Sequence, residues 1–284
     1  HLNRLGLRAP AVLQSDLETG FALIEDFGNR TFTRLLDAGE PHEALYTQAI
    51  DLLIHLHQQP NALLEGLKPY DFETLMTEAF LMPDWFLPLI SGQPTAPQDR
   101  EHYQQIWGTV FASLPTPAIS LVLRDFHVDN LMQLPADEPF QRIGLLDFQD
   151  ALIGPMAYDL MSLLEDARRN LPPALAEQMQ QRYFQAMPLL EMENFQLWYR
   201  ILAAQRHCKV AGIFSRLAIR DDKAQYLEHI PRVLRLLQAH LEDPLLRPLG
   251  DWLRACGITD NTVGSRADYH SVRRTLGLAE PSAD

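Results

Sequence analysis

Three short apolar runs interrupt a chain that is otherwise patterned for helices. Residues 119–123 (ISLVL), 131–134 (LMQL) and 142–148 (RIGLLDF) are too short for typical helices and fit buried strands. The turn cluster PADEP separates the second run from the third. Polar residues fill the gaps between the runs, and loops held at strand ends often carry function. We therefore expect the functional site in these gaps.

Helices are predicted on both sides of these strands. In ALYTQAIDLLIHLHQQP, apolar residues recur at i, i+3, i+4 and i+7, and Pro60 ends the pattern. Pro83 predicts a kink or break in the next stretch, residues 72–90. Further helices are expected over residues 98–114, 156–165, 173–187, 191–217, 222–241 and 245–255.

A β-hairpin is predicted near the N-terminus. Residues 11–14 and 21–27 have strand composition, and SDLETG between them forms a turn that ends in Gly20. A lone two-stranded ribbon is only marginally stable in water, so these strands need further partners. The whole pattern predicts an α+β fold with a small β part and a large helical part.

Composition and charge exclude several classes of function. The formal net charge of −13 argues against nonspecific binding to nucleic acid or to an anionic membrane surface. Cys208 and Cys256 are the only cysteines, so there is no disulfide framework and no zinc-type spacing. No apolar run reaches the length of a membrane span, and no secretory signal opens the chain. We expect a soluble cytoplasmic protein, and the sequence leaves its oligomeric state open.

Three polar residues at the ends of the predicted strands fit phosphoryl transfer. Asp125 and Asn130 form the pattern D-x-x-x-x-N, and Asp147 follows the next strand in LLDFQD. Phosphoryl transfer needs a carboxylate to accept the proton of the attacking hydroxyl and oxygen ligands to hold Mg²⁺. Asp125 suits the first role, and Asn130 and Asp147 suit the second. The alternative is a surface turn with a helix cap at Asp129 or Asn130 and an ordinary Asp147 at a strand end.

Several stretches together resemble a known family. LRDFHVDN, LLDFQD and GPMAYDLMSLLED are similar to the aminoglycoside phosphotransferase family, which has the protein-kinase-like fold. FALIEDFG resembles that family's strand into the interlobe hinge, and IDLLIHLHQ resembles its helix ending in Leu-His. DFQDALIGPMAYDLMSLLEDAR and AAQRHCKVAGIFSRLAIRDDKAQYLEHIPR are most similar to the family's bacterial anomeric N-acetylmuramate and N-acetylglucosamine kinases.

The resemblance implies a kinase-like α+β fold with a truncated N-terminal β lobe and a large, mainly helical C-terminal lobe. Residues 1–28 would be the remainder of the β lobe and the hinge, residues 29–257 the helical catalytic lobe, and residues 258–284 a C-terminal tail. The family has a glycine-rich loop and a strand lysine that anchor the phosphates. Neither precedes the hinge-like IEDF, because the only lysines are Lys68, Lys209 and Lys223. We therefore expect an N-terminally incomplete kinase.

The resemblance also implies roles for the residues of the site. Asp125 would be the catalytic base, Asn130 and Asp147 would bind Mg²⁺, and the backbone around Glu25 and Phe27 would contact the adenine of ATP.

Other polar residues keep two interpretations each. Asp159 would brace the catalytic loop, although helix capping or complementation of the helix dipole fits equally well. His127 and Asp129 would contact a sugar hydroxyl or make hydrogen bonds within the loop. Arg206 and Lys209 lie on a cationic helix face that would bind an anionic group of the substrate, or would be solvated or ion-paired.

The resemblance predicts an ATP- and Mg²⁺-dependent kinase of a small amino sugar. It would phosphorylate the anomeric hydroxyl of N-acetylmuramate or N-acetylglucosamine, in peptidoglycan recycling. One alternative keeps the fold but takes an aminoglycoside, choline or another small alcohol. An alternative of another class is a non-catalytic pseudokinase or binding module, which the missing loop and lysine favour, together with Leu123 where the family has histidine.

Overall fold

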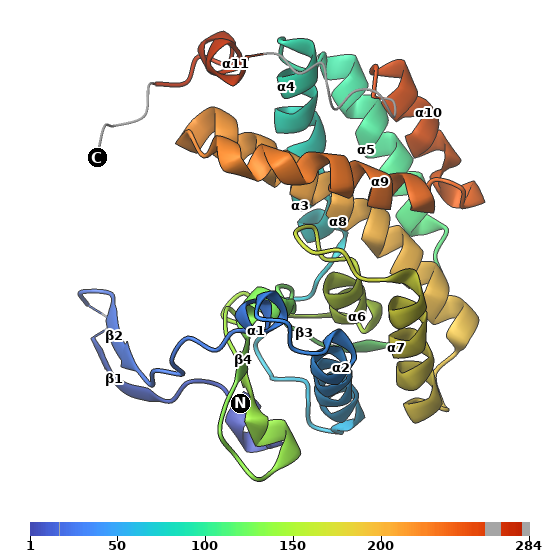
Figure 1. Ribbon diagram of the computed structural model, residues 1–284. Helices are drawn as coiled ribbons and strands as arrows, with labels where there is room; N and C mark the ends of the chain where they lie inside the picture. Colours follow the sequence, from blue (N-terminus) through green and yellow to red (C-terminus); the bar gives the residue numbers. More distant parts are fainter. Residues whose placement is uncertain (17, 259–267, 280–284) are drawn as a thin grey trace. The chain divides into compact units, whose positions relative to one another are not determined.

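The computed structural model describes residues 1–16, 18–258 and 268–279. These residues form two compact units (Figure 1). The first unit contains residues 1–69, 117–166 and 170–195, and the second contains 70–116, 167–169 and the described part of 196–284. The expected boundaries at residues 28 and 257 stay predictions, and parts of the expected tail, residues 259–267 and 280–284, lie outside the described residues.

The first unit combines short strands with a few helices. Its elements are η1 (Leu2–Leu5), β1 (Val12–Asp16), β2 (Phe21–Ile24), α1 (Phe32–Asp37), α2 (His42–Gln58), β3 (Ile119–Val122), η3 (Val128–Asn130), β4 (Leu131–Gln133), η4 (Pro139–Arg142), β5 (Ile143–Leu145), β6 (Leu152–Pro155), α6 (Ala157–Leu164) and α7 (Pro173–Ala186). The long helix α8 (Met192–Asp221) begins in this unit and continues in the second.

The second unit is helical in its described part. Its elements are α3 (Phe72–Ala79), the π-helical segment η2 (Met82–Phe86), α4 (Leu87–Ser91), α5 (Pro97–Ala112), most of α8, η5 (Ala224–His229), α9 (Ile230–His240), η6 (Pro244–Leu246), α10 (Arg247–Ala255) and α11 (Tyr269–Thr275). None of the helices in the described part of the chain combines the length and the apolarity that a bilayer crossing requires. With the first unit, this arrangement confirms the predicted α+β class.

The strands of the first unit form three antiparallel pairs. β1 and β2 form the predicted hairpin, in which Asp16 pairs with Phe21. β3 pairs with β6, and β4 pairs with β5. The strand β6 was not predicted, because it has four residues and ends in Gly154 and Pro155, which are both poor strand formers. Its partner residues lie 30 or more positions earlier in the chain, so no local pattern indicates the pairing.

The β4–β5 hairpin is supported along both edges. On one edge, the N–H of Leu145 donates to the carbonyl oxygen of Arg8 at 2.8 Å. On the other, the N–H of Gln133 donates to the carbonyl oxygen of Arg30, also at 2.8 Å. Because a ladder with two supported edges has little freedom to shift its register, the loops at the end of this hairpin have fixed starting points.

Pro83 divides the predicted helix over residues 72–90, as expected. α3 ends at Ala79, and η2, which contains Pro83, leads into α4. The backbone of Leu81 in this interruption packs directly against Gly212 of α8. A Cβ atom at residue 212 would lie 2.2 Å from the carbonyl carbon of Leu81, which is too close for any real contact. Gly212 therefore permits the close approach of the α3–α4 segment to α8.

We predict that Gly212→Ala destabilises the protein by about 2 kcal/mol or more, because the added methyl group forces two backbones apart. Gly108→Ala is the matched control. Gly108 also lies in a helix of the second unit, but its added Cβ would meet only the Phe72 ring, at 4.0 Å. That control should be neutral or stabilising by up to about 1 kcal/mol, since alanine is the better helix former. Equal free energies of unfolding for the two variants, from urea titration, would contradict the packing described.

Candidate active site

The loop after β3 is held by the carboxylate of Asp159. The N–H groups of Leu123 and Arg124 donate to Asp159 Oδ2 at 2.6 Å and to Asp159 Oδ1 at 2.9 Å. Asp159 is fully buried. Arg124 has a φ of 71°, a left-handed conformation that non-glycine residues adopt only under constraint. The two hydrogen bonds stabilise this turn of the backbone.

A second side chain of α6 completes the support of Arg124. The hydroxyl of Ser162 donates to the carbonyl oxygen of Arg124 at 3.3 Å. Asp159 and Ser162 are three positions apart, so they lie on the same face of α6. In the described residues no side chain caps the N-terminus of α6, so the carboxylate of Asp159 serves the loop, although its place in the first helical turn also suits the helix dipole. These contacts are the ones that the bracing role requires.

Leu123 stands where the family has histidine, and its backbone N–H still helps to anchor the loop. Its side chain is buried with 3% exposure, and its N–H makes the shorter of the two bonds to Asp159. The replacement of histidine by leucine therefore leaves the anchoring of the loop intact.

The hairpin register brings Asn130 and Asp147 together. Leu131 pairs with Leu145, and the N–H of Leu146 donates to the carbonyl oxygen of Asn130 at 3.0 Å. The amide nitrogen of Asn130 lies 3.0 Å from the carbonyl oxygen of Asp125 and 3.4 Å from Asp147 Oδ2. The side chain of Asn130 therefore contacts the backbone of Asp125 and the carboxylate of Asp147.

The residues around this cluster fit a magnesium ion. The nitrogen of the Asn130 amide is engaged by Asp125, so the amide oxygen is the atom left to act as a ligand. Asp147 is exposed, and its carboxylate offers a second hard oxygen ligand. Mg²⁺ commonly takes one or two protein carboxylate or amide oxygens and fills its other positions with water and phosphate oxygens.

Two features that the amino-acid sequence does not reveal position the side chain of Asp147. Its φ of 56° is left-handed although the residue is not glycine. Gln149 Nε2 donates to Asp147 Oδ1 at 2.5 Å. The only signal for Gln149 in the sequence is its place two residues after Asp147 in LLDFQD.

His127 and Asp129 are both engaged within the first unit. Asp129 accepts a hydrogen bond from the hydroxyl of Thr33, which lies in α1. The buried ring of His127 lies beside Asn130, with 3.4 Å between His127 Nε2 and Asn130 Nδ2. These contacts agree with the loop-stabilising alternative for both residues, and contact with a sugar hydroxyl stays a prediction. Thr33, 96 positions before Asp129, carries no signal of this bond in the sequence.

The expected hinge is fixed to the segment that precedes it. The carboxylate of Glu25 accepts hydrogen bonds from the side chain of Arg8 and from the N–H of Ala11, and the bond from Arg8 lowers the pKa of Glu25. The N–H of Glu25 donates to the carbonyl oxygen of Ala11 at 2.8 Å, so this donor is engaged. The ring of Phe27 covers Gly144 of β5, where a Cβ atom would lie 2.5 Å from the ring. Contact of Glu25 and Phe27 with adenine stays a prediction.

Comparison with known proteins gives the family. The family described as "Phosphotransferase enzyme family" matches residues 1–198. The chain belongs to this family. A relative named N-acetylmuramate/N-acetylglucosamine kinase, from Neisseria meningitidis, is 39% identical over 82% of this chain and 70% of the relative. Another of the same name, from Caulobacter vibrioides, is 35% identical over 88% of this chain and 71% of the relative.

A solved structure shares the fold of this phosphotransferase. It is a choline/ethanolamine kinase family protein from Mesorhizobium loti, with a TM-score of 0.57 and 15% identity. The alignment covers 89% of this chain and 80% of that chain. At this level of identity the likeness shows the fold alone, and it confirms the kinase-like architecture that the sequence predicts.

The two cationic residues of α8 that were predicted to bind the substrate, Arg206 and Lys209, are buried in the second unit. Lys209 Nζ lies 2.8 Å from Glu78 Oε1 in an ion pair whose side chains are each 9% exposed. Glu78 also accepts a hydrogen bond from the hydroxyl of Tyr70, and Gln205 Nε2 donates to the carbonyl oxygen of Leu75 at 2.9 Å. Arg206 is 8% exposed. Lys209 therefore links α8 to α3, and a role of either cation in substrate binding stays a prediction.

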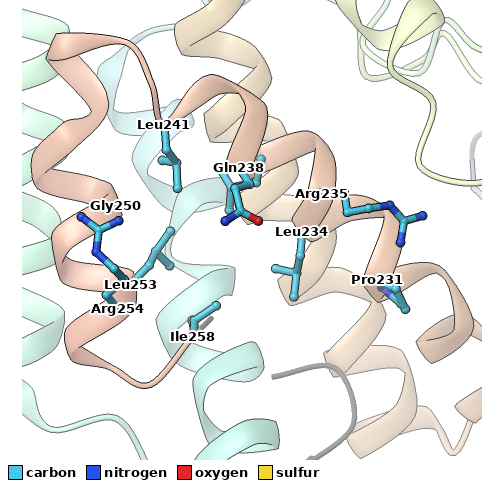
Figure 2. A pocket seen from close by; sticks show the side chains of 10 residues that line it. Pro231, Leu234, Arg235, Gln238, Leu241, Gly250, Leu253, Arg254 and Ile258 are labelled. Carbon is cyan, nitrogen blue, oxygen red and sulfur yellow. The ribbon is translucent and has the colours of Figure 1, made fainter. Parts of the chain in front are cut away.

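A cavity of about 610 Å³ lies between α9 and α10 of the same unit. Figure 2 shows its lining, with an apolar floor that includes Leu234 and Leu253 and with Arg235 and Arg254 beside it. None of the residues predicted for phosphoryl transfer lines this cavity. Its size alone therefore does not indicate the catalytic position.

We predict that Lys209→Met lowers the free energy of unfolding by about 3 kcal/mol or more, because it leaves Glu78 as an unpaired buried charge. The double variant Lys209→Met/Glu78→Gln removes both charges and should recover much of that loss. If Lys209 instead acts on the substrate, the double variant will keep the raised KM of the single variant even where its stability is restored. Urea unfolding and steady-state kinetics on the same three proteins distinguish the two roles.

Proposed function

We propose that this phosphotransferase is an ATP- and Mg²⁺-dependent sugar kinase. It phosphorylates the anomeric hydroxyl of N-acetylmuramate or N-acetylglucosamine, in the cytoplasmic recycling of peptidoglycan. The observation that carries the proposal is the position of Asn130, whose side chain lies against both Asp125 and Asp147. The proposed proton acceptor lies on the loop after β3, and the two proposed oxygen ligands lie at the end of the β4–β5 hairpin; the contacts of Asn130 join these two parts.

The proposed reaction assigns one task to each residue. The carboxylate of Asp125 orients the acceptor hydroxyl and takes its proton as the hydroxyl oxygen attacks the γ-phosphorus of ATP. The bond from that phosphorus to the bridging oxygen breaks, and ADP leaves with the electron pair. The oxygens of Asn130 and Asp147 would hold Mg²⁺, which would supply positive charge to neutralise the phosphates. These groups are kept in position by Asp159, Ser162 and Gln149. Correct positioning of the reacting groups supplies much of the rate enhancement of such reactions.

The choice of acceptor rests on the relatives. Two kinases named for N-acetylmuramate and N-acetylglucosamine align with more than four-fifths of the chain at 35% and 39% identity. An anomeric hydroxyl is more acidic than an ordinary alcohol, so a carboxylate of modest basicity such as Asp125 is sufficient to accept its proton.

We predict that Asp125→Asn lowers kcat by about 100-fold to 10,000-fold, because the amide cannot accept the proton of the acceptor. The measurement is ADP release by the natural full-length protein over a panel of N-acetylated amino sugars, aminoglycosides and choline. Asp137→Asn, at an exposed position of the β4–β5 hairpin, is the matched control and should leave kcat unchanged.

The panel separates the remaining possibilities. Turnover confined to N-acetylmuramate and N-acetylglucosamine supports the proposal. Turnover confined to aminoglycosides or choline would overturn the proposed acceptor while keeping the chemistry. ADP release that is the same in Asp125→Asn would overturn the mechanism, and no release with any acceptor would favour a binding module.

A further inference from the structure

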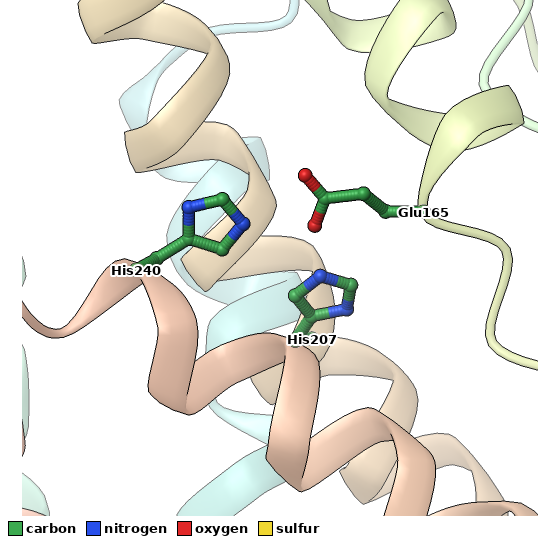
Figure 3. A group of neighbouring side chains, drawn as sticks. All are labelled: Glu165, His207 and His240. Carbon is green, nitrogen blue, oxygen red and sulfur yellow. The ribbon is translucent and has the colours of Figure 1, made fainter. Parts of the chain in front are cut away.

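Two imidazole rings of the second unit face each other from different helices. His207 lies in the middle of α8, and His240 is the last residue of α9 (Figure 3). Their ring centroids are 6.0 Å apart, and the rings are inclined by only 19°. A nitrogen of one ring lies within 4.8 Å of a nitrogen of the other. His207 is 1% exposed and His240 is half-buried.

We propose that His207 and His240 together bind a divalent transition-metal ion, with Zn²⁺ as the species expected. Neutral imidazole is a ligand suited to zinc, copper and nickel, whereas magnesium prefers oxygen ligands. The proposed site is therefore chemically distinct from the Asn130–Asp147 pair. Two protein ligands leave further positions of the ion for water or for another donor.

Chelation of an ion requires the two rings to turn and their nitrogens to move closer together. At Zn–N distances of about 2.0–2.1 Å, two ligands of one tetrahedral ion are about 3.3 Å apart. The nitrogens of His207 and His240 are thus at most about 1.5 Å farther apart than chelation requires. His240 ends its helix and is only half-buried, so we expect this side chain, and not the buried His207, to make most of the movement.

A neighbouring ion pair helps to keep the two histidines close to each other. Arg200 Nε lies 2.9 Å from Asp243 Oδ2, and Asp243 is only 9% exposed in its side chain. Arg200 is seven positions before His207, hence on the same face of α8, and Asp243 is three positions after His240. This contact fixes the C-terminal end of α9 against α8. Because the ligands are already held close together, binding costs less ordering of the chain.

The test is zinc binding by the full-length protein without a histidine tag, after removal of metals and in the presence of excess Mg²⁺. Calorimetric titration with ZnCl₂ should show one zinc ion per chain at this site, and zinc should raise the Tm. His240→Gln should weaken binding about tenfold or more and abolish the rise in Tm. His102→Gln is the matched control, since His102 is exposed on α5 of the same unit, and it should bind zinc like the unmodified protein.

Cobalt supplies an independent readout at the same residues. The visible spectrum of the Co²⁺-loaded protein should show nitrogen coordination that disappears in His240→Gln and persists in His102→Gln. His207→Gln should behave like His240→Gln if it folds; if it does not fold, the half-buried His240 decides the question. Failure of the unmodified protein to bind zinc at a large molar excess, or equal zinc affinity in His240→Gln, would overturn the proposal.

Discussion

The buried carboxylate of Asp159 is the constraint on which the site depends. This one side chain accepts hydrogen bonds from two successive backbone N–H groups, those of Leu123 and Arg124. The hydroxyl of Ser162 donates a hydrogen bond to the carbonyl oxygen of Arg124. A backbone turn with positive φ at arginine is costly by itself, and buried contacts of this kind stabilise it. Because Asp125 directly follows Arg124, this turn determines the position of the Asp125 backbone. The base of the proposed reaction is therefore placed by a helix 34 positions away in the sequence and not by its own neighbours.

The β4–β5 hairpin places the other half of the site. Its edges are bonded to the backbone at Arg8 and Arg30, and its register aligns Asn130 with the residue before Asp147. The amide of Asn130 then contacts both Asp125 and Asp147. The loop fixed by α6 and the hairpin fixed by its edges thus meet at one residue, so a shift of either would separate the proposed base from the proposed Mg²⁺ ligands.

Much of this organisation could be predicted from local patterns. The strands around Leu121, Met132 and Gly144 were predicted from short apolar runs, and the break at Pro83 from its missing N–H and its ring. The three residues proposed for phosphoryl transfer could be identified because each lies next to one end of such a run. What escaped prediction depends on distant partners. These are the pairing of β6 with β3, the bond from Thr33 to Asp129, and the identity of Glu78, 131 positions away, as the ion-pair partner of Lys209. The positive φ values of Arg124 and Asp147 escaped for the same reason, since tertiary bonds and not residue type impose them.

The most direct test of the central claim is the kcat of Asp159→Asn, measured at a temperature where circular dichroism shows the variant to be folded. Asparagine keeps the shape of the side chain but offers one acceptor oxygen, so one of the two N–H groups loses its partner, at a cost of about 1–3 kcal/mol. With the turn loosened, kcat should fall about tenfold or more while Asp150→Asn, at an exposed position near the same loop, keeps full activity. A folded Asp159→Asn protein with undiminished kcat would contradict the claim that this carboxylate positions the catalytic base.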